Sequence, residues 1–131
     1  MSINTPQNND IRVLVVDDEV AIRELFQHAI RKFFRSGGPH FLAVSTGQEA
    51  LDALRLGFEK SEPYTVAFVD LVLGAPPEGL SLITEMHHLD PFLQFAVISG
   101  HLDTSFVQAI SEELPADKYM LISKPFQTRD I

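Results

Sequence analysis

Short apolar runs alternate with amphipathic segments along the chain. The runs fall at 13–16, 41–44, 66–69, 95–98 and 119–122. A run that is apolar at every position is typical of a strand buried on both faces, as in a parallel sheet. Between the runs, apolar residues recur at three- and four-residue steps, as in Ile22, Phe26 and Ile30, and this spacing predicts helices. The alternation predicts an α/β fold in which a parallel sheet carries helices on both faces.

Helix boundaries are marked by polar residues and proline. Thr46 is followed three residues later by Glu49, which predicts a capping box at the start of the second helix. Asp103 or Thr104 is expected to cap the fourth helix, and Pro91 is expected to end the third.

The two ends of the chain differ from the middle. Residues 1–10 are polar and predict a disordered tail, which leaves 11–131 as one domain. Only 126–131 follow Pro125, so we expect a fifth helix to be truncated or absent. A missing helix would expose an apolar flank beside the first helix. We therefore expect a fragment of a longer protein, a chain that lacks its output region, or a homodimer that covers this flank.

Composition narrows the class of protein. Among 131 residues, 18 are acidic and 10 are basic, which gives a formal net charge of −8. Such a surface disfavours direct binding to nucleic acid or to anionic lipid. The absence of cysteine excludes disulfides, cysteine-bound zinc and thiol chemistry. No apolar run reaches the roughly 20 residues that cross a bilayer, and no secretory signal is visible. We expect a cytoplasmic protein with no membrane association.

Chemically active side chains follow the predicted strands. They are Asp17, Asp18, Asp70, Ser99 and Lys124. Because the carboxyl ends of parallel strands share one edge, we expect these groups to converge there. Clustered carboxylates repel one another unless a cation intervenes, and an open site with few oxygen ligands favours Mg²⁺ over Ca²⁺. Zinc is disfavoured, because only His101 lies near these strand ends. Each Asp alone could instead form a turn or, like Asp18 or Glu19, cap a helix.

The ordered set of these segments resembles the receiver domain of two-component response regulators. The resemblance rests on 13–19 (VLVVDDE), 68–71 (FVDL), 97–101 (VISGH) and 124–126 (KPF), and on the start of the second helix at 46–51. It spans residues 11–126. It implies a flavodoxin-like, doubly wound sheet of five parallel strands in the order 2-1-3-4-5.

The resemblance also implies a role for each strand-end residue. Asp70 would accept a phosphoryl group from the phosphohistidine of a sensor histidine kinase or phosphotransfer protein. Asp18, Asp70 and the Val72 carbonyl would bind Mg²⁺ directly, and Asp17 would act mainly through water. Lys124 would pair with a phosphoryl oxygen.

The implied switch would act on a downstream effector. Ser99 would turn inward to the phosphoryl group, and the Lys124–Pro125 bond is a candidate cis peptide. The domain would be a signalling phosphoacceptor rather than an enzyme, with Mg²⁺-dependent self-phosphorylation. An apolar Val72 cannot orient water, so we expect slow self-dephosphorylation.

The sequence departs from the family pattern at two places. Gly74 stands where the family usually has proline, and Glu78-Gly79 replaces the usual Asp-Gly after a loop that is one residue longer. Leu121 occupies the position of an aromatic residue that often moves with the hydroxyl. Tyr119 is interpreted as a strand-edge residue.

The same residues leave three alternative functions. A degenerate receiver that is not phosphorylated and serves as a protein-docking module is the main alternative. An aspartyl-nucleophile phosphohydrolase would need a second Asp where Val72 stands. A flavin binder would need a phosphate loop where Asp17, Asp18 and Glu19 would repel phosphate.

Overall fold

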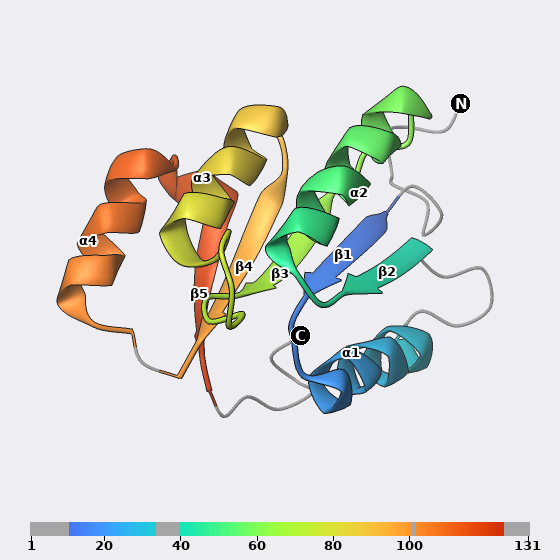
Figure 1. The fold of residues 1–131 in the computed structure, drawn as a ribbon, viewed down its shortest axis with the longest axis horizontal. Helices are drawn as coiled ribbons and strands as arrows, with labels where there is room; N and C mark the ends of the chain where they lie inside the picture. The colour runs from blue at the N-terminus through green and yellow to red at the C-terminus, as the bar shows by residue number, and fades with distance from the viewer. Residues whose placement is uncertain (1–10, 34–39, 101, 125–131) are drawn as a thin grey trace, which may run out of the picture.

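Strands and helices alternate along the chain in the computed structural model, which describes residues 11–33, 40–100 and 102–124 (Figure 1). The strands are β1 (Arg12–Val16), β2 (His40–Val44), β3 (Val66–Asp70), β4 (Gln94–Ser99) and β5 (Tyr119–Ser123). The α-helices are α1 (Val20–Phe33), α2 (Gly47–Glu59), α3 (Gly79–Leu89) and α4 (Thr104–Glu113). A short 3-10 helix, Ala116–Lys118, precedes β5.

The five strands form one parallel sheet in the order β2-β1-β3-β4-β5. This order confirms the predicted fold class. Register aligns the strand ends, since Asp70 lies opposite Ile98 and Ser99 lies opposite Ser123. The residues at the carboxyl ends of β1, β3, β4 and β5 are therefore brought to one edge of the sheet.

Two apolar clusters pack on opposite faces of the sheet, because successive side chains of a strand point to opposite sides. In β1, Leu14 and Val16 join the cluster that includes Leu54 of α2 and Met86 of α3. Val13 and Val15 join the cluster that includes Phe26 of α1. These four side chains of β1 are all buried, as the continuous apolar run predicted.

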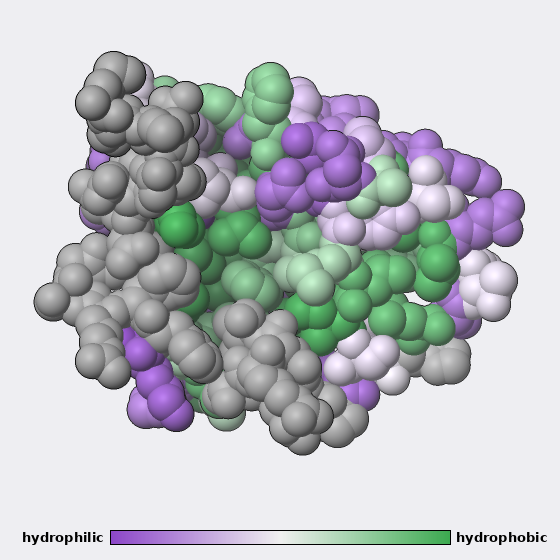
Figure 2. Space-filling view, turned by 180° about the vertical axis from the view of Figure 1, so that it is seen from behind, coloured by the Kyte–Doolittle hydropathy of each residue, from purple (hydrophilic) through white to green (hydrophobic). Residues whose placement is uncertain are grey.

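The two faces are covered by different helices. Figure 1 shows α2 and α3 on one side of the sheet and α1 on the other. Hydrophobic surface gathers in the middle of the molecule in the view from behind (Figure 2). Met120 of β5 is exposed, whereas its neighbour Ile122 is buried in the α1-side cluster.

Polar residues cap the starts of α2 and α4, as the sequence predicted. The Thr46 hydroxyl accepts a hydrogen bond from the Glu49 amide, and the Glu49 carboxylate accepts one from the Thr46 amide. This capping box stabilises the start of α2 by about 1 kcal/mol. Asp103, rather than Thr104, caps α4 through the Phe106 amide. Helix α3 ends at Leu89, two residues before Pro91.

Several sequence expectations concern residues outside the described part of the chain. They are the tail 1–10, the fifth helix after Pro125, the Lys124–Pro125 bond and His101. Among the described residues, no helix combines the length and the apolar character needed to span a bilayer.

Candidate functional site

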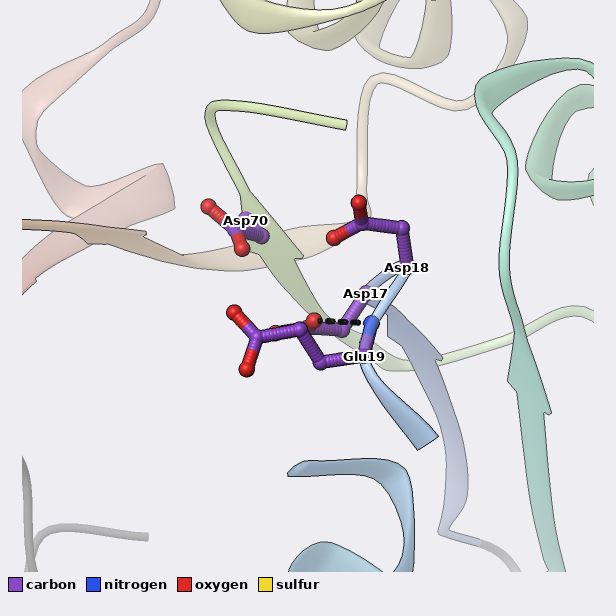
Figure 3. A group of neighbouring side chains, drawn as sticks. All are labelled: Asp17, Asp18, Glu19 and Asp70. Carbon is purple, nitrogen blue, oxygen red and sulfur yellow. Dashed lines mark hydrogen bonds between the residues drawn. The ribbon is translucent and has the colours of Figure 1, made fainter. Parts of the chain in front are cut away.

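The acidic and basic strand-end residues meet at the carboxyl edge of the sheet. Asp17 and Asp18 follow β1, and Asp70 is the last residue of β3. Carboxylate oxygens of Asp17, Asp18, Glu19 and Asp70 all lie within 4.8 Å of one another (Figure 3). Lys124, directly after β5, places its Nζ 2.8 Å from Asp70 Oδ2. The structure thus brings together the groups that the sequence placed at strand ends.

Two of the four carboxylates are buried and two are open to solvent. Asp17 is 1% exposed and Asp70 is 3% exposed, whereas Asp18 and Glu19 are exposed. Backbone amides hold the two buried carboxylates. Asp17 Oδ1 accepts a 2.9 Å hydrogen bond from the Glu19 amide, and Asp70 Oδ1 accepts a 3.1 Å hydrogen bond from the Val72 amide. The site therefore has a fixed inner wall and an accessible outer side.

Burial raises the pKa of Asp17 to about 6, and the nearby Asp70 carboxylate adds to this effect. The hydrogen bond from the Glu19 amide and the charge of Lys124 act in the opposite direction. Asp17 Oδ2 is also buried, and no described residue donates a hydrogen bond to it. A buried carboxylate oxygen without a donor is costly, and a cation would remove that cost.

Lys124 is the ammonium group that faces the cluster from β5. Burial alone would lower the pKa of Lys124, but the hydrogen bond to Asp70 and the charges of Asp70 and Asp17 raise it above its ordinary value. The ammonium group is therefore charged at neutral pH. One ammonium group on four carboxylates leaves the site strongly negative.

These residues fit a hard divalent cation. Mg²⁺ prefers oxygen ligands, binds through one or two carboxylates and keeps several water molecules. The cluster offers carboxylate oxygens at close range, one of them buried with no donor among the described residues, and an open side for water and phosphate oxygens. The described residues of the cluster include no histidine, in keeping with Mg²⁺ rather than Zn²⁺.

Ser99 and Lys124 are joined through the backbone. Ser99 is the last residue of β4 and is buried, and the Lys124 amide donates a 2.8 Å hydrogen bond to the Ser99 carbonyl. This bond continues the β4–β5 pairing by one residue. It places the Ser99 hydroxyl and the Lys124 ammonium group on adjacent strands at the same edge.

Two site residues were missed from the sequence. Glu19 was not predicted as a metal-site residue, but its carboxylate belongs to the acidic cluster (Figure 3). Arg23, one turn into α1, donates a 2.7 Å hydrogen bond from Nη1 to the Asp17 carbonyl. The available signal was the place of Arg23 near the start of α1, because side chains of a helix lean toward its N-terminus.

The loop between β3 and α3 borders the site. The Leu71 amide donates a hydrogen bond to the Ile98 carbonyl, so the loop leaves the sheet only after that residue. Val72 is 69% exposed. Gly74 has a φ of +86°, which favours glycine and which proline cannot adopt, at the position where the family pattern usually has proline. The Pro76–Pro77 bond is cis, a feature that the sequence did not indicate.

The comparisons with known proteins agree with this geometry. The family model described as "Response regulator receiver domain" matches residues 13–131. A receiver domain protein (CheY-like) from Methanospirillum hungatei JF-1 is similar with a TM-score of 0.70 and 24% identity, over 92% of this chain and 86% of that one. A receiver protein from Sinorhizobium medicae WSM419 gives a TM-score of 0.72 and 23% identity over the same shares.

A longer protein is also similar. NtrX from Brucella abortus gives a TM-score of 0.69 and 29% identity over 91% of this chain, which corresponds to 24% of the NtrX chain. No curated protein gives a significant match.

Proposed function

The chain belongs to the response regulator receiver domain family, and on this premise we propose that Asp70 is its phosphoryl acceptor. The donor would be the phosphohistidine of a sensor histidine kinase or of a phosphotransfer protein. The observation that carries the proposal is the 2.8 Å contact between Lys124 Nζ and Asp70 Oδ2 inside a cluster of four carboxylates. A buried carboxylate with an ammonium partner, beside carboxylates that fit a divalent cation, is suited to accepting a phosphoryl group once that cation neutralises the cluster.

The transfer exchanges one bond to phosphorus for another. An Asp70 carboxylate oxygen attacks the phosphorus atom, a P–O bond forms, and the P–N bond to the donor histidine breaks. Such transfers depend on positioning and on neutralising charge more than on a strong nucleophile. The Val72 amide holds Asp70 Oδ1 in place, which leaves Oδ2, the atom that contacts Lys124, as the reacting oxygen. Lys124 would then pair with a phosphoryl oxygen.

Mg²⁺ would be the required cofactor. Asp18, Asp70 and the Val72 carbonyl would hold it, with Asp17 acting mainly through water. When bound, it would neutralise charge on the carboxylates and on the phosphoryl oxygens. The Asp17 oxygen that lacks a donor among the described residues supports a cation on this side of the site.

Ser99 would transmit the effect of phosphorylation from the site to the rest of the domain. It lies at the end of β4, beside Lys124, where its hydroxyl can turn toward a phosphoryl group on Asp70. Phosphorylation adds up to about two negative charges and three acceptor oxygens, so it favours the inward rotamer of a nearby donor. The output would reach an effector domain or protein, or a second copy of the chain. In NtrX the similar region is part of a longer chain, which supports an effector in the same polypeptide.

The test is phosphorylation by acetyl phosphate and MgCl₂, followed by intact mass. We expect one phosphoryl adduct on the wild-type protein and on Asp52→Asn, a control that removes an exposed carboxylate of α2. Asp70→Asn should give no adduct. An adduct on Asp70→Asn would place the acceptor elsewhere.

A second measurement separates a phosphorylated receiver from a docking module. Beryllofluoride with Mg²⁺ mimics the phosphoryl group, and we expect it to shift the amide resonances of Ser99 and Lys124. A folded wild-type protein that gives neither adduct nor shift would instead support the docking module.

A further inference from the structure

The loop after Asp70 is closed by one carboxylate. Glu78 Oε1 accepts a 2.7 Å hydrogen bond from the Leu73 amide and a 3.2 Å hydrogen bond from the Gly74 amide. Both amides lie in the segment that borders the acidic cluster. A single oxygen thus ties two consecutive backbone groups of the loop to the residue that precedes α3.

Glu78 holds this loop instead of capping its own helix. It is the N-cap residue of α3, a position whose side chain commonly accepts a hydrogen bond from the first turn. Glu78 makes no such bond to the described residues of α3. Its carboxylate turns back to the loop instead. A residue that served only the helix would be expected to face forward.

The first of these hydrogen bonds orients the Val72 carbonyl. The Leu73 N–H and the Val72 C=O belong to the same planar peptide unit, and in a trans peptide they point in opposite directions. Fixing the N–H against Glu78 Oε1 therefore fixes the direction of the carbonyl oxygen. A charged acceptor on the N–H also polarises the peptide and strengthens the negative end of the carbonyl.

The second hydrogen bond holds the loop beside Asp18. A methyl group added at Gly74 would lie 3.8 Å from Asp18 Oδ2, so the Gly74 backbone is next to this exposed carboxylate. Glu78 accepts from the Gly74 amide and so restrains the loop at this contact. One residue thereby restrains the surroundings of both Val72 and Asp18.

We propose that Glu78 is a positioning residue for the cation site, which it serves by fixing the Val72–Leu73 peptide and the adjacent loop. This inference rests on the proposed function, because it assumes that Mg²⁺ binds at the cluster. It also gives a reason for glutamate at this position. The glutamate side chain is long enough to reach from the start of α3 back to the Leu73 and Gly74 amides.

The test compares Mg²⁺ affinity with the protection of the loop amides from hydrogen exchange. Isothermal titration with MgCl₂ is performed on the wild type, Glu78→Ala, Glu78→Asp and Glu78→Gln, with Glu85→Gln as a control on the exposed face of α3. Thermal unfolding in EDTA identifies a temperature at which every variant is folded. Hydrogen exchange of the Leu73 and Gly74 amides is measured in EDTA on the same samples.

We expect Mg²⁺ to bind about tenfold more weakly to Glu78→Ala and Glu78→Asp, with faster exchange of both amides. Aspartate keeps the charge but is one methylene too short. Glutamine has the same side-chain length and keeps an acceptor oxygen, so the Mg²⁺ affinity of Glu78→Gln should stay within about threefold of that of the wild type. Glu85→Gln should match the wild type.

Three results would overturn the inference. Unchanged Mg²⁺ affinity in Glu78→Ala or Glu78→Asp would overturn it while leaving the proposed function intact. Equal loss in Glu78→Gln would show that charge, and not positioning, is what matters. A folded wild-type protein that binds no Mg²⁺ would overturn both the inference and the cation-dependent function.

Discussion

Lys124 and Asp70 are joined by a 2.8 Å hydrogen bond that crosses the sheet from the end of β5 to the end of β3. The strand between them is β4, which ends at Ser99. The ion pair therefore spans the end of β4, where Ser99 lies, and Ser99 is the residue that we propose as the first to respond to phosphorylation. A group that draws Lys124 away from Asp70 acts directly beside Ser99.

Removing the Lys124 ammonium group should slow phosphorylation. Lys124→Met keeps much of the side-chain length but supplies no charge or donor to a phosphoryl oxygen. We expect the rate of adduct formation from acetyl phosphate to fall by about 10²-fold, the loss typical of removing one donor that stabilises a transition state. A time course of intact mass measures it. Lys118→Met, which changes a lysine of the 3-10 helix, is the control, and equal rates in both variants would contradict the proposed role of Lys124.

The stability of the Mg²⁺-free protein should decrease as the pH rises through the titration of Asp17. The folded state raises the pKa of Asp17 from 3.8 to about 6, so between these values the folded state binds more protons than the unfolded state. The free energy of unfolding therefore falls with rising pH across this window, by up to about 3 kcal/mol.

Asp17→Asn tests this dependence, because asparagine does not ionise. Urea unfolding in EDTA from pH 4 to pH 8 should show a shallower decline in the variant than in the wild type. The variant should also be the more stable of the two at pH 8. A parallel decline in both proteins would show that another group is responsible. Asp52→Asn, an exposed carboxylate on α2, should follow the wild type.

A polar residue at position 72 should shorten the life of the phosphoryl adduct. Val72 is exposed and lies two residues after Asp70, where an apolar side chain cannot hold a water molecule. We expect Val72→Asn to speed hydrolysis on the order of tenfold, less than a full general base would give. The half-life is followed by intact mass after acetyl phosphate is removed. Leu56→Asn changes another exposed apolar residue, on α2, and should leave the half-life unchanged.

Gly47 should not tolerate a side chain. It is the first residue of α2, and an added Cβ would overlap the backbone carbonyl of Pro77. We expect Gly47→Ala to destabilise the fold by about 1–3 kcal/mol, measured by urea unfolding. Gly100→Ala is the matched control, because a Cβ there meets no described atom within 4 Å. Similar unfolding free energies for the two variants would contradict this account of the α2–loop contact.

Much of the fold follows from local pattern. The continuous apolar runs identified all five strands, and the capping residues Thr46 and Asp103 identified two helix starts. The strand order came from the family resemblance, because pattern alone does not say which strands are neighbours. The run at 41–44 missed His40, a polar residue that pairs with Arg12 at the sheet's edge.

The site could be predicted where it depends on strand ends and not where it depends on loops. Parallel register is enough to bring Asp17, Asp70 and Lys124 to one edge. The hydrogen bond from the Leu73 amide to Glu78 depends on the path of the loop between them. A loop has no repeating pattern of apolar residues from which that path could be predicted. Glu19 was missed for a related reason, since its side-chain direction follows from how the chain turns into α1.

The hydrogen bonds between Arg12 and Thr65 lie where β1 begins, at the rim opposite the acidic cluster. Because all five strands are parallel, the acidic cluster and Lys124 lie together at the rim formed by the carboxyl ends of the strands. Lys60, just past the end of α2, lies toward the other rim. A label attached at Lys60 would therefore lie at the rim opposite Asp70, away from the acidic cluster.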